Sequence, residues 1–208
     1  MEKELEKMNM KKEKIMESIK EQLEKQDAMG HLPIYEKIVD DEYAIIEQQI
    51  KAKYSGIDTK SITIASVTKS FPRGGEVIYS NAYGSNYYGK TYIQYIAPDE
   101  TAEIINDYLH GKLTTLDDLL KYLLGTGLSA KFKPISVAIM IYGGLEFLDS
   151  FLTSNTIRDI ESGTGASKTI TVDTSYNQST VWVEWDTYDS VSIPSESLYI
   201  KDVTYEIY

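Results

Sequence analysis

The residue pattern alternates along the chain between helix-like and strand-like blocks, and this order restricts the fold more than any other feature. Residues 1–55 are rich in Lys and Glu, whereas Ser, Thr, Tyr, Ile and Val dominate residues 60–97. A helical pattern returns over residues 99–152, and strand-like alternation returns over residues 168–208. Separate blocks of this kind are typical of α+β folds. We therefore predict N-terminal helices, then a mainly antiparallel β-sheet or sandwich that an α-helical segment over about 99–152 interrupts.

The change in composition near residue 56 predicts two parts. Residues 1–55 form a charged helical N-terminal region, a candidate leader or regulatory segment, and residues 56–208 form an α+β domain with the helical insertion 99–152. In the first 26 residues a heptad-like apolar seam is interrupted by Lys12, so we favour a solvated terminal helix over a coiled-coil partner site. Pro33 and Gly56 are suited to the start and the end of a second helix.

Charge and cysteine content exclude several classes of function. The net charge of -11 argues against binding to nucleic acid, which requires clustered Lys and Arg. The chain has no Cys, so disulfides, thiolate nucleophiles and Cys-based zinc sites are ruled out. The first 26 residues are charged throughout and lack the apolar core of a signal peptide.

The most apolar stretch is KFKPISVAIMIYGGLEF, residues 131–147. Its uncharged run from Pro134 to Leu145 covers 12 residues, and a membrane span needs roughly 20. Together with the apolar helix expected over 116–124, it forms a hairpin that either fills a core, which we favour, or is released at a membrane. The residues that would contact a membrane or partner are Lys131, Lys133, Ile139, Ile141, Gly143 and Gly144.

The strand VWVEWDTYD is the most site-like of the predicted strands. With a period of two, Val181, Val183 and Trp185 share one face and fit a core. The opposite face would carry two aromatic rings and two carboxylates, a combination suited to stacking on sugars and accepting their hydroxyl hydrogens. These candidate ligand-binding residues are Trp182, Glu184, Asp186 and Tyr188. Solvent-facing residues without a binding role are the favoured alternative.

A second candidate binding surface is the segment NAYGSNYYGKTY. Mixtures of Tyr, Ser, Gly and Asn form adaptable contact surfaces, because Tyr offers a large area at a low entropic cost. We predict an exposed aromatic loop with four candidate ligand-binding residues, namely Tyr83, Tyr87, Tyr88 and Tyr92.

No pattern predicts a catalytic residue, a cofactor or a metal site. The only histidines are His31 and His110; no GxSxG surrounds a serine, and no HExxH is present. SGTGASKT (residues 162–169) departs from the phosphate-loop pattern, because Ser precedes Lys168 and a strand follows it. Only a reaction that uses carboxylates alone, such as glycoside hydrolysis, stays open.

With 17 Tyr, no Cys and a charged helical region before a β domain, the chain resembles in composition exported bacteriocin-like or toxin-like proteins of Gram-positive bacteria. The resemblance implies a non-enzymatic secreted effector that binds a cell-envelope component or a protein partner and inserts the apolar hairpin into a membrane. A cytoplasmic location is left open. The alternatives are a β domain that binds a carbohydrate or a protein without membrane activity, and, ranked below it, a carboxylate-based glycoside hydrolase.

Overall fold

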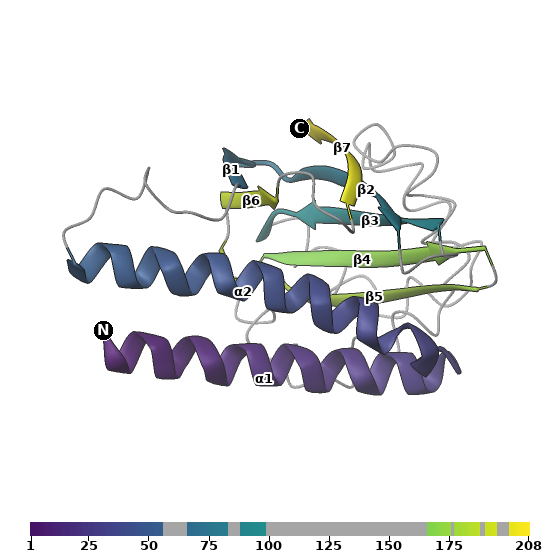
Figure 1. Ribbon diagram of the computed structural model, residues 1–208, viewed down its shortest axis with the longest axis horizontal. Coiled ribbons are helices and arrows are strands. Elements are labelled where there is room, and N and C mark those ends of the chain that lie inside the picture. The colour runs from purple at the N-terminus through teal and green to yellow at the C-terminus, as the bar shows by residue number, and fades with distance from the viewer. Residues whose placement is uncertain (56–65, 83–87, 99–165, 176, 188–189, 195–199) are drawn as a thin grey trace.

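The chain folds as an α+β protein in which two long N-terminal helices pack on an antiparallel sheet (Figure 1). This confirms the predicted fold class. The computed structural model describes residues 1–55, 66–82, 88–98, 166–175, 177–187, 190–194 and 200–208. The predicted helical insertion over 99–152 lies outside these residues.

The two helices run antiparallel and are joined by a short turn. Helix α1 spans Glu2–Lys25, the 3₁₀ helix η1 spans Met29–His31, and helix α2 spans Leu32–Ser55. The prediction that the first helix is merely solvated is wrong, because α1 buries one apolar stripe against α2 and the sheet. Lys12, which interrupts the apolar seam, forms a 2.7 Å ion pair with Asp40 of α2.

Seven strands form two sheets in the described part of the chain. The larger sheet has the order β5-β4-β3-β2-β7, and every neighbouring pair in it is antiparallel. A small antiparallel sheet joins β1 and β6. The strand bounds are β1 Ser66–Ser70, β2 Gly75–Ala82, β3 Tyr88–Ile96, β4 Ser167–Thr174, β5 Gln178–Glu184, β6 Ser190–Pro194 and β7 Ile200–Ile207.

A tight turn centred on Gly74 leads into strand β2, and the φ of 84° at Gly74 suits glycine. A Cβ on Gly74 would collide with the carbonyl oxygen of Tyr95. The chain can therefore return directly into β2, which pairs with β3 over its whole length.

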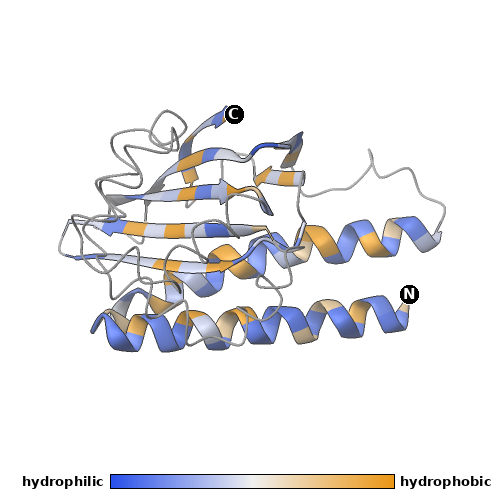
Figure 2. Ribbon diagram, turned by 180° about the vertical axis from the view of Figure 1, so that it is seen from behind, coloured by the Kyte–Doolittle hydropathy of each residue, from blue (hydrophilic) through white to orange (hydrophobic). Residues whose placement is uncertain are grey.

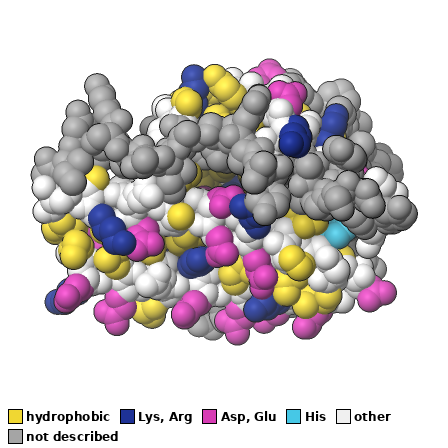
Figure 3. Space-filling view, in the orientation of Figure 1, with side chains coloured by type: hydrophobic (Ala, Val, Ile, Leu, Met, Phe, Trp, Pro, Cys, Tyr) yellow, Lys and Arg dark blue, Asp and Glu magenta, His cyan; other side chains and the backbone are white. Residues whose placement is uncertain are grey.

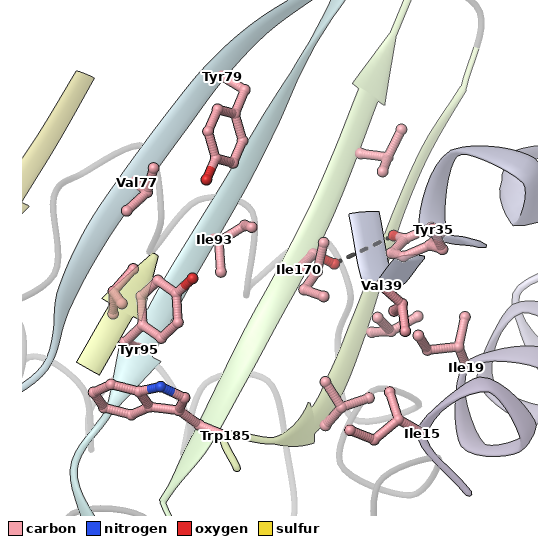
Figure 4. Packing of buried hydrophobic residues seen from close by; sticks show 14 of the residues in the cluster. Ile15, Ile19, Tyr35, Val39, Val77, Tyr79, Ile93, Tyr95, Ile170 and Trp185 are labelled. Carbon is pink, nitrogen blue, oxygen red and sulfur yellow. Dashed lines mark hydrogen bonds between the residues drawn. The ribbon is translucent and has the colours of Figure 1, made fainter. Parts of the chain in front are cut away.

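One hydrophobic core joins the helices to one face of the large sheet (Figure 4). Apolar residues of α1 and α2 meet alternate residues of β2, β3, β4 and β5, and Figure 2 shows apolar patches along both helices. The Tyr35 hydroxyl donates to the carbonyl oxygens of Ile170 (3.2 Å) and Ser179 (2.9 Å), which connects α2 to two strands. Residues 1–55 thus share their core with the strands.

Helix α1 also covers the edge of the sheet at β5, beside which it lies in Figure 1. The Gln22 amide donates to the carbonyl oxygen of Trp182 and accepts from its N–H, both at 2.7 Å. Gln26 does the same at Thr180, at 2.6 and 3.1 Å. Four residues of helix rise about 6 Å, and two residues of strand span about 6.7 Å. Side chains one helical turn apart can therefore serve alternate strand residues.

In the described part of the chain, no helix has both the length and the apolar character needed to cross a membrane. The predicted membrane hairpin, with Lys131, Lys133, Ile139, Ile141, Gly143 and Gly144, lies outside the described residues.

Candidate functional site

A pocket of about 300 Å³ lies between helix α2, the end of β5 and strand β6. This volume is at the lower end of the range for small-molecule sites. Its lining combines two carboxylates, an amide, three hydroxyl-bearing residues and three apolar or aromatic residues: Glu42, Gln49, Asp186, Thr187, Ser190, Ser192, Ile46, Tyr95 and Val191. The pocket therefore offers both hydrogen-bonding groups and an apolar surface.

Helix α2 supplies one wall. Glu42, Ile46 and Gln49 are spaced by four and three residues, so they lie on one stripe of the helix. The buried side chains of Tyr35, Val39 and Tyr43 hold α2 against the sheet. The wall is thus positioned by the core itself.

Tyr95 is the aromatic residue of the lining, and its ring packs against two other buried rings. The ring centroids of Tyr95 and Trp185 are 4.9 Å apart, and Figure 4 shows the two rings beside each other. Phe71 also meets the Tyr95 ring edge-on, with centroids 5.6 Å apart. Burial raises the pKa of Tyr95 well above its ordinary value, so its hydroxyl stays protonated. Tyr95 therefore adds no charge to the pocket.

Two hydrogen bonds join Thr187, just after β5, to Ser190 at the start of β6. The Ser190 N–H donates to the carbonyl oxygen of Thr187 (2.8 Å), and the Thr187 hydroxyl donates to the carbonyl oxygen of Ser190 (2.8 Å). These bonds hold Thr187 and Ser190 together at the pocket.

The Glu42 carboxylate is paired with the ammonium group of Lys168 on β4. The Lys168 side chain is only 3% exposed and that of Glu42 is 21% exposed. A buried ammonium group needs such a partner, because desolvation of an isolated charge is costly. The pair therefore fixes the Glu42 side chain at the pocket wall.

The Asp186 carboxylate is held from two helices. One oxygen accepts from the Tyr43 hydroxyl at 2.6 Å, and the other is paired with Lys11 of α1, which also lies 3.8 Å from Glu184. Burial, and then the negative charge of Asp186, raises the pKa of Tyr43 far above its ordinary value. The tyrosine therefore remains a hydrogen-bond donor to Asp186.

The charges around the pocket nearly balance. Glu42, Asp186 and Glu184 face the two ammonium groups of Lys11 and Lys168, which leaves one net negative charge. Figure 3 shows the same interspersion of acidic and basic side chains across the face formed by the two helices. Such a site accepts neutral hydrogen-bond donors more readily than anions.

The prediction that the VWVEWDTYD strand carries one sugar-binding face is wrong. Trp182 is 0% exposed and cannot stack on a sugar. Strand β5 ends at Glu184, so the strict alternation stops there, and Asp186 contacts the two helices instead. Val181 and Val183 do lie in the core, as predicted. Tyr188 lies outside the described residues.

The predicted aromatic loop is shorter than expected, because β3 begins at Tyr88. Tyr92 lies inside that strand and is half-buried, and burial raises its pKa. Tyr83 and Tyr87 lie outside the described residues. In the part of the chain that the structure describes, only Asp186 among the predicted ligand-binding residues lines the pocket.

Sequence reasoning missed the residues that accompany Asp186, namely Lys11, Glu42, Tyr43 and Lys168. Glu42 and Lys168 lie 126 positions apart, so no local pattern indicates their pairing. A weak signal existed in Lys168, a charged residue in a strand that is otherwise free of charge until Asp173. A buried charge of this kind predicts a partner, although not which one.

His31 contacts a serine hydroxyl in the protein interior. Its Nδ1 lies 2.6 Å from the Ser179 hydroxyl, and both residues are buried, with His31 7% exposed and Ser179 2% exposed. Neither residue lines the pocket. The contact therefore joins the turn between the helices to the start of β5. Among the described residues, no cluster of His, Asp or Glu could hold a metal ion.

Acid should weaken the fold through His31. Burial lowers the pKa of His31 below its ordinary value of 6.5, and the opposing effect of Asp173 is smaller. The unfolded chain therefore binds a proton on His31 as the pH falls below about 6.5, whereas the folded chain binds this proton only at a lower pH. Protonation thus favours the unfolded chain. We expect the urea midpoint to be lower at pH 5 than at pH 7, and the drop to be smaller in His31→Gln. An equal drop in both proteins would contradict this assignment.

Comparison of the chain with protein-family models, with curated proteins and with solved structures finds no match.

Proposed function

We propose that the protein binds a small neutral ligand rich in hydroxyl groups, of the carbohydrate class, in the pocket between α2 and β6. The observation that carries this proposal is the lining of the pocket, in which carboxylate, amide and hydroxyl groups lie beside the apolar side chains of Ile46 and Val191 and the ring of Tyr95. Sugar hydroxyls both donate and accept hydrogen bonds, so they complement a mixed lining of this kind.

The ion pairs favour this ligand class over charged ones. Both carboxylates at the pocket already have an ammonium partner, so little negative charge is left to attract a cation. An anion would meet the one net negative charge of the site. A hydroxyl donor can use the remaining lone pairs of the fixed carboxylates without disturbing their partners.

The test is titration of the full chain with a panel of mono- and oligosaccharides, followed by calorimetry and by saturation-transfer NMR. Gln49→Trp should fill the pocket from the α2 wall without touching an ion pair, and we expect it to weaken binding about tenfold or more. Lys51→Trp, on an exposed position of the same helix, is the matched control. Absence of binding across the panel by the folded wild-type protein would overturn the proposal.

The exported, envelope-binding effector stays a prediction, since its apolar hairpin falls outside the described residues. Ligand binding by the pocket is compatible with that role, because recognition of an envelope saccharide requires a site of this chemistry. The glycoside hydrolase alternative also stays a prediction. Release of reducing sugar during the same titration would support it, with Glu42 and Asp186 as the carboxyl groups to test.

A further inference from the structure

The two edges of the large sheet are treated differently. At β5, the side chains of Gln22 and Gln26 of α1 form hydrogen bonds with the main-chain groups of Trp182 and Thr180. At the other edge, β7 pairs with β2 alone among the described strands, and it is the uppermost strand in Figure 1. Six of its eight residues are exposed. A long, uncovered edge strand is a template for pairing with another chain.

The main-chain groups that face outward from β7 can be identified. The Tyr208 N–H donates to the carbonyl oxygen of Gly74 at 3.1 Å, so this residue points toward β2. Hydrogen-bonded and non-bonded positions alternate in an antiparallel pair. Val203, Tyr205 and Ile207 therefore direct their N–H and C=O groups away from β2.

The same three residues place an apolar stripe at this edge. They share one face of the sheet, since their side chains repeat every second residue. Tyr205 is 46% exposed and Ile207 is 41% exposed, which is unusual for large apolar side chains on one short strand. The Lys69 ammonium group lies 4.9 Å from the Tyr205 ring centroid. The edge thus offers unpaired main chain and exposed apolar surface together.

We propose that two copies of this chain associate through β7, paired antiparallel across a two-fold axis at Tyr205. In this register Tyr205 lies opposite Tyr205 of the second copy, and Val203 lies opposite Ile207. Each of these outward-facing residues exchanges main-chain hydrogen bonds with the residue opposite it. The exposed side chains of Tyr205 and Ile207 then meet Tyr205 and the partly buried Val203 of the second copy.

Charge selects this register over its neighbours. A two-fold axis at Thr204 would set Asp202 opposite Glu206 twice, and like charges directly opposite each other are destabilising. An axis at Val203 would leave Ile207 beyond the paired residues and set Lys201 opposite Tyr205. The register at Tyr205 places Thr204 opposite Glu206 and brings no like charges directly opposite.

Association of two acidic chains depends on salt. Each copy carries a net charge of -11, so the copies repel one another at low ionic strength. Salt screens this repulsion over about 8–10 Å at 0.1–0.15 M, while main-chain pairing and apolar contact persist. The dimer should therefore become tighter as the salt concentration rises.

The test begins with sedimentation equilibrium of the full chain, where a dimer is expected. Because the chain has no Cys, a single Tyr205→Cys substitution reports the two-fold axis directly. Opposite residues of a hydrogen-bonded pair have Cα atoms about 5.5 Å apart, which lies within the range for a disulfide. Tyr205→Cys should cross-link under mild oxidation faster than Lys14→Cys, an exposed control on α1. Faster cross-linking of Thr204→Cys or Val203→Cys would overturn the proposed register.

Two further variants separate association from folding. Tyr205→Pro removes an outward N–H that β2 does not use, so it should raise the dimer dissociation constant about tenfold or more. Thr204→Lys should tighten the dimer, because it sets a cation opposite Glu206 of the second copy. A wild-type chain that is monomeric at every salt concentration, or a dimer that Tyr205→Pro leaves unchanged, would overturn the proposal.

Discussion

Glu42→Leu should lower the free energy of unfolding by about 3 kcal/mol, because it leaves the ammonium group of Lys168 buried without its partner. Removal of one member of a buried ion pair typically costs about 3–5 kcal/mol. The lower end applies here, since the Glu42 side chain keeps 21% of its exposure and water reaches the pair. Urea unfolding followed by circular dichroism gives the value.

The neighbouring residue supplies the control. Asp41 forms an ion pair of 2.9 Å with Lys37 on the same helix, and both side chains are more than 40% exposed. Asp41→Asn should cost less than about 0.5 kcal/mol. The double variant Glu42→Leu with Lys168→Met should recover most of the lost stability, because neither charge is then buried. Equal losses for Glu42→Leu and Asp41→Asn would contradict the structural role of the pair.

Gln22→Leu should cost about 2–4 kcal/mol, because it strips both hydrogen bonds from the main chain of Trp182 at the covered edge of the sheet. A buried peptide group left without a partner costs about 1–3 kcal/mol. Leucine preserves the bulk of the side chain and the helical preference of the position. The loss should therefore report the hydrogen bonds and not the helix.

Hydrogen exchange locates this effect. The Trp182 amide should exchange faster in Gln22→Leu than in the wild-type protein, at urea concentrations below the unfolding transition. Gln26→Leu should have a smaller effect, since Gln26 is only partly buried and its bond from the Thr180 N–H is longer, at 3.1 Å. Glu21→Leu, an exposed neighbour on α1, is the control. An unchanged exchange rate at Trp182 would show that the glutamine does not protect the edge.

The same contact explains an error in the prediction for α1. Gln22 and Gln26 read in the sequence as polar residues of a solvated helix, and glutamine is indeed common on such surfaces. Their function depends on strand residues more than 150 positions away. A polar side chain that satisfies another segment's main chain leaves no trace in hydrophobic periodicity, so the helix looked more exposed than it is.

The candidate site was predictable only in fragments. Asp186 was selected for its place beside aromatic residues on an alternating strand, and it does line the pocket. The reason was wrong, however, because β5 ends at Glu184 and the chain turns at Asp186 and Thr187. Strict period-two reasoning holds only while the strand continues. It therefore grouped Asp186 with Trp182, which is completely buried.

Local residue patterns were sufficient to predict the fold class, the two helices and the valine face of β5, because burial imposes a period on each of these segments. The pairing of Glu42 with Lys168, the cover of β5 by α1 and the place of β7 at the edge of the described sheet arise only when distant segments meet. Such contacts depend on the order and register of the strands. These are properties of the folded chain as a whole, so no single segment carries them.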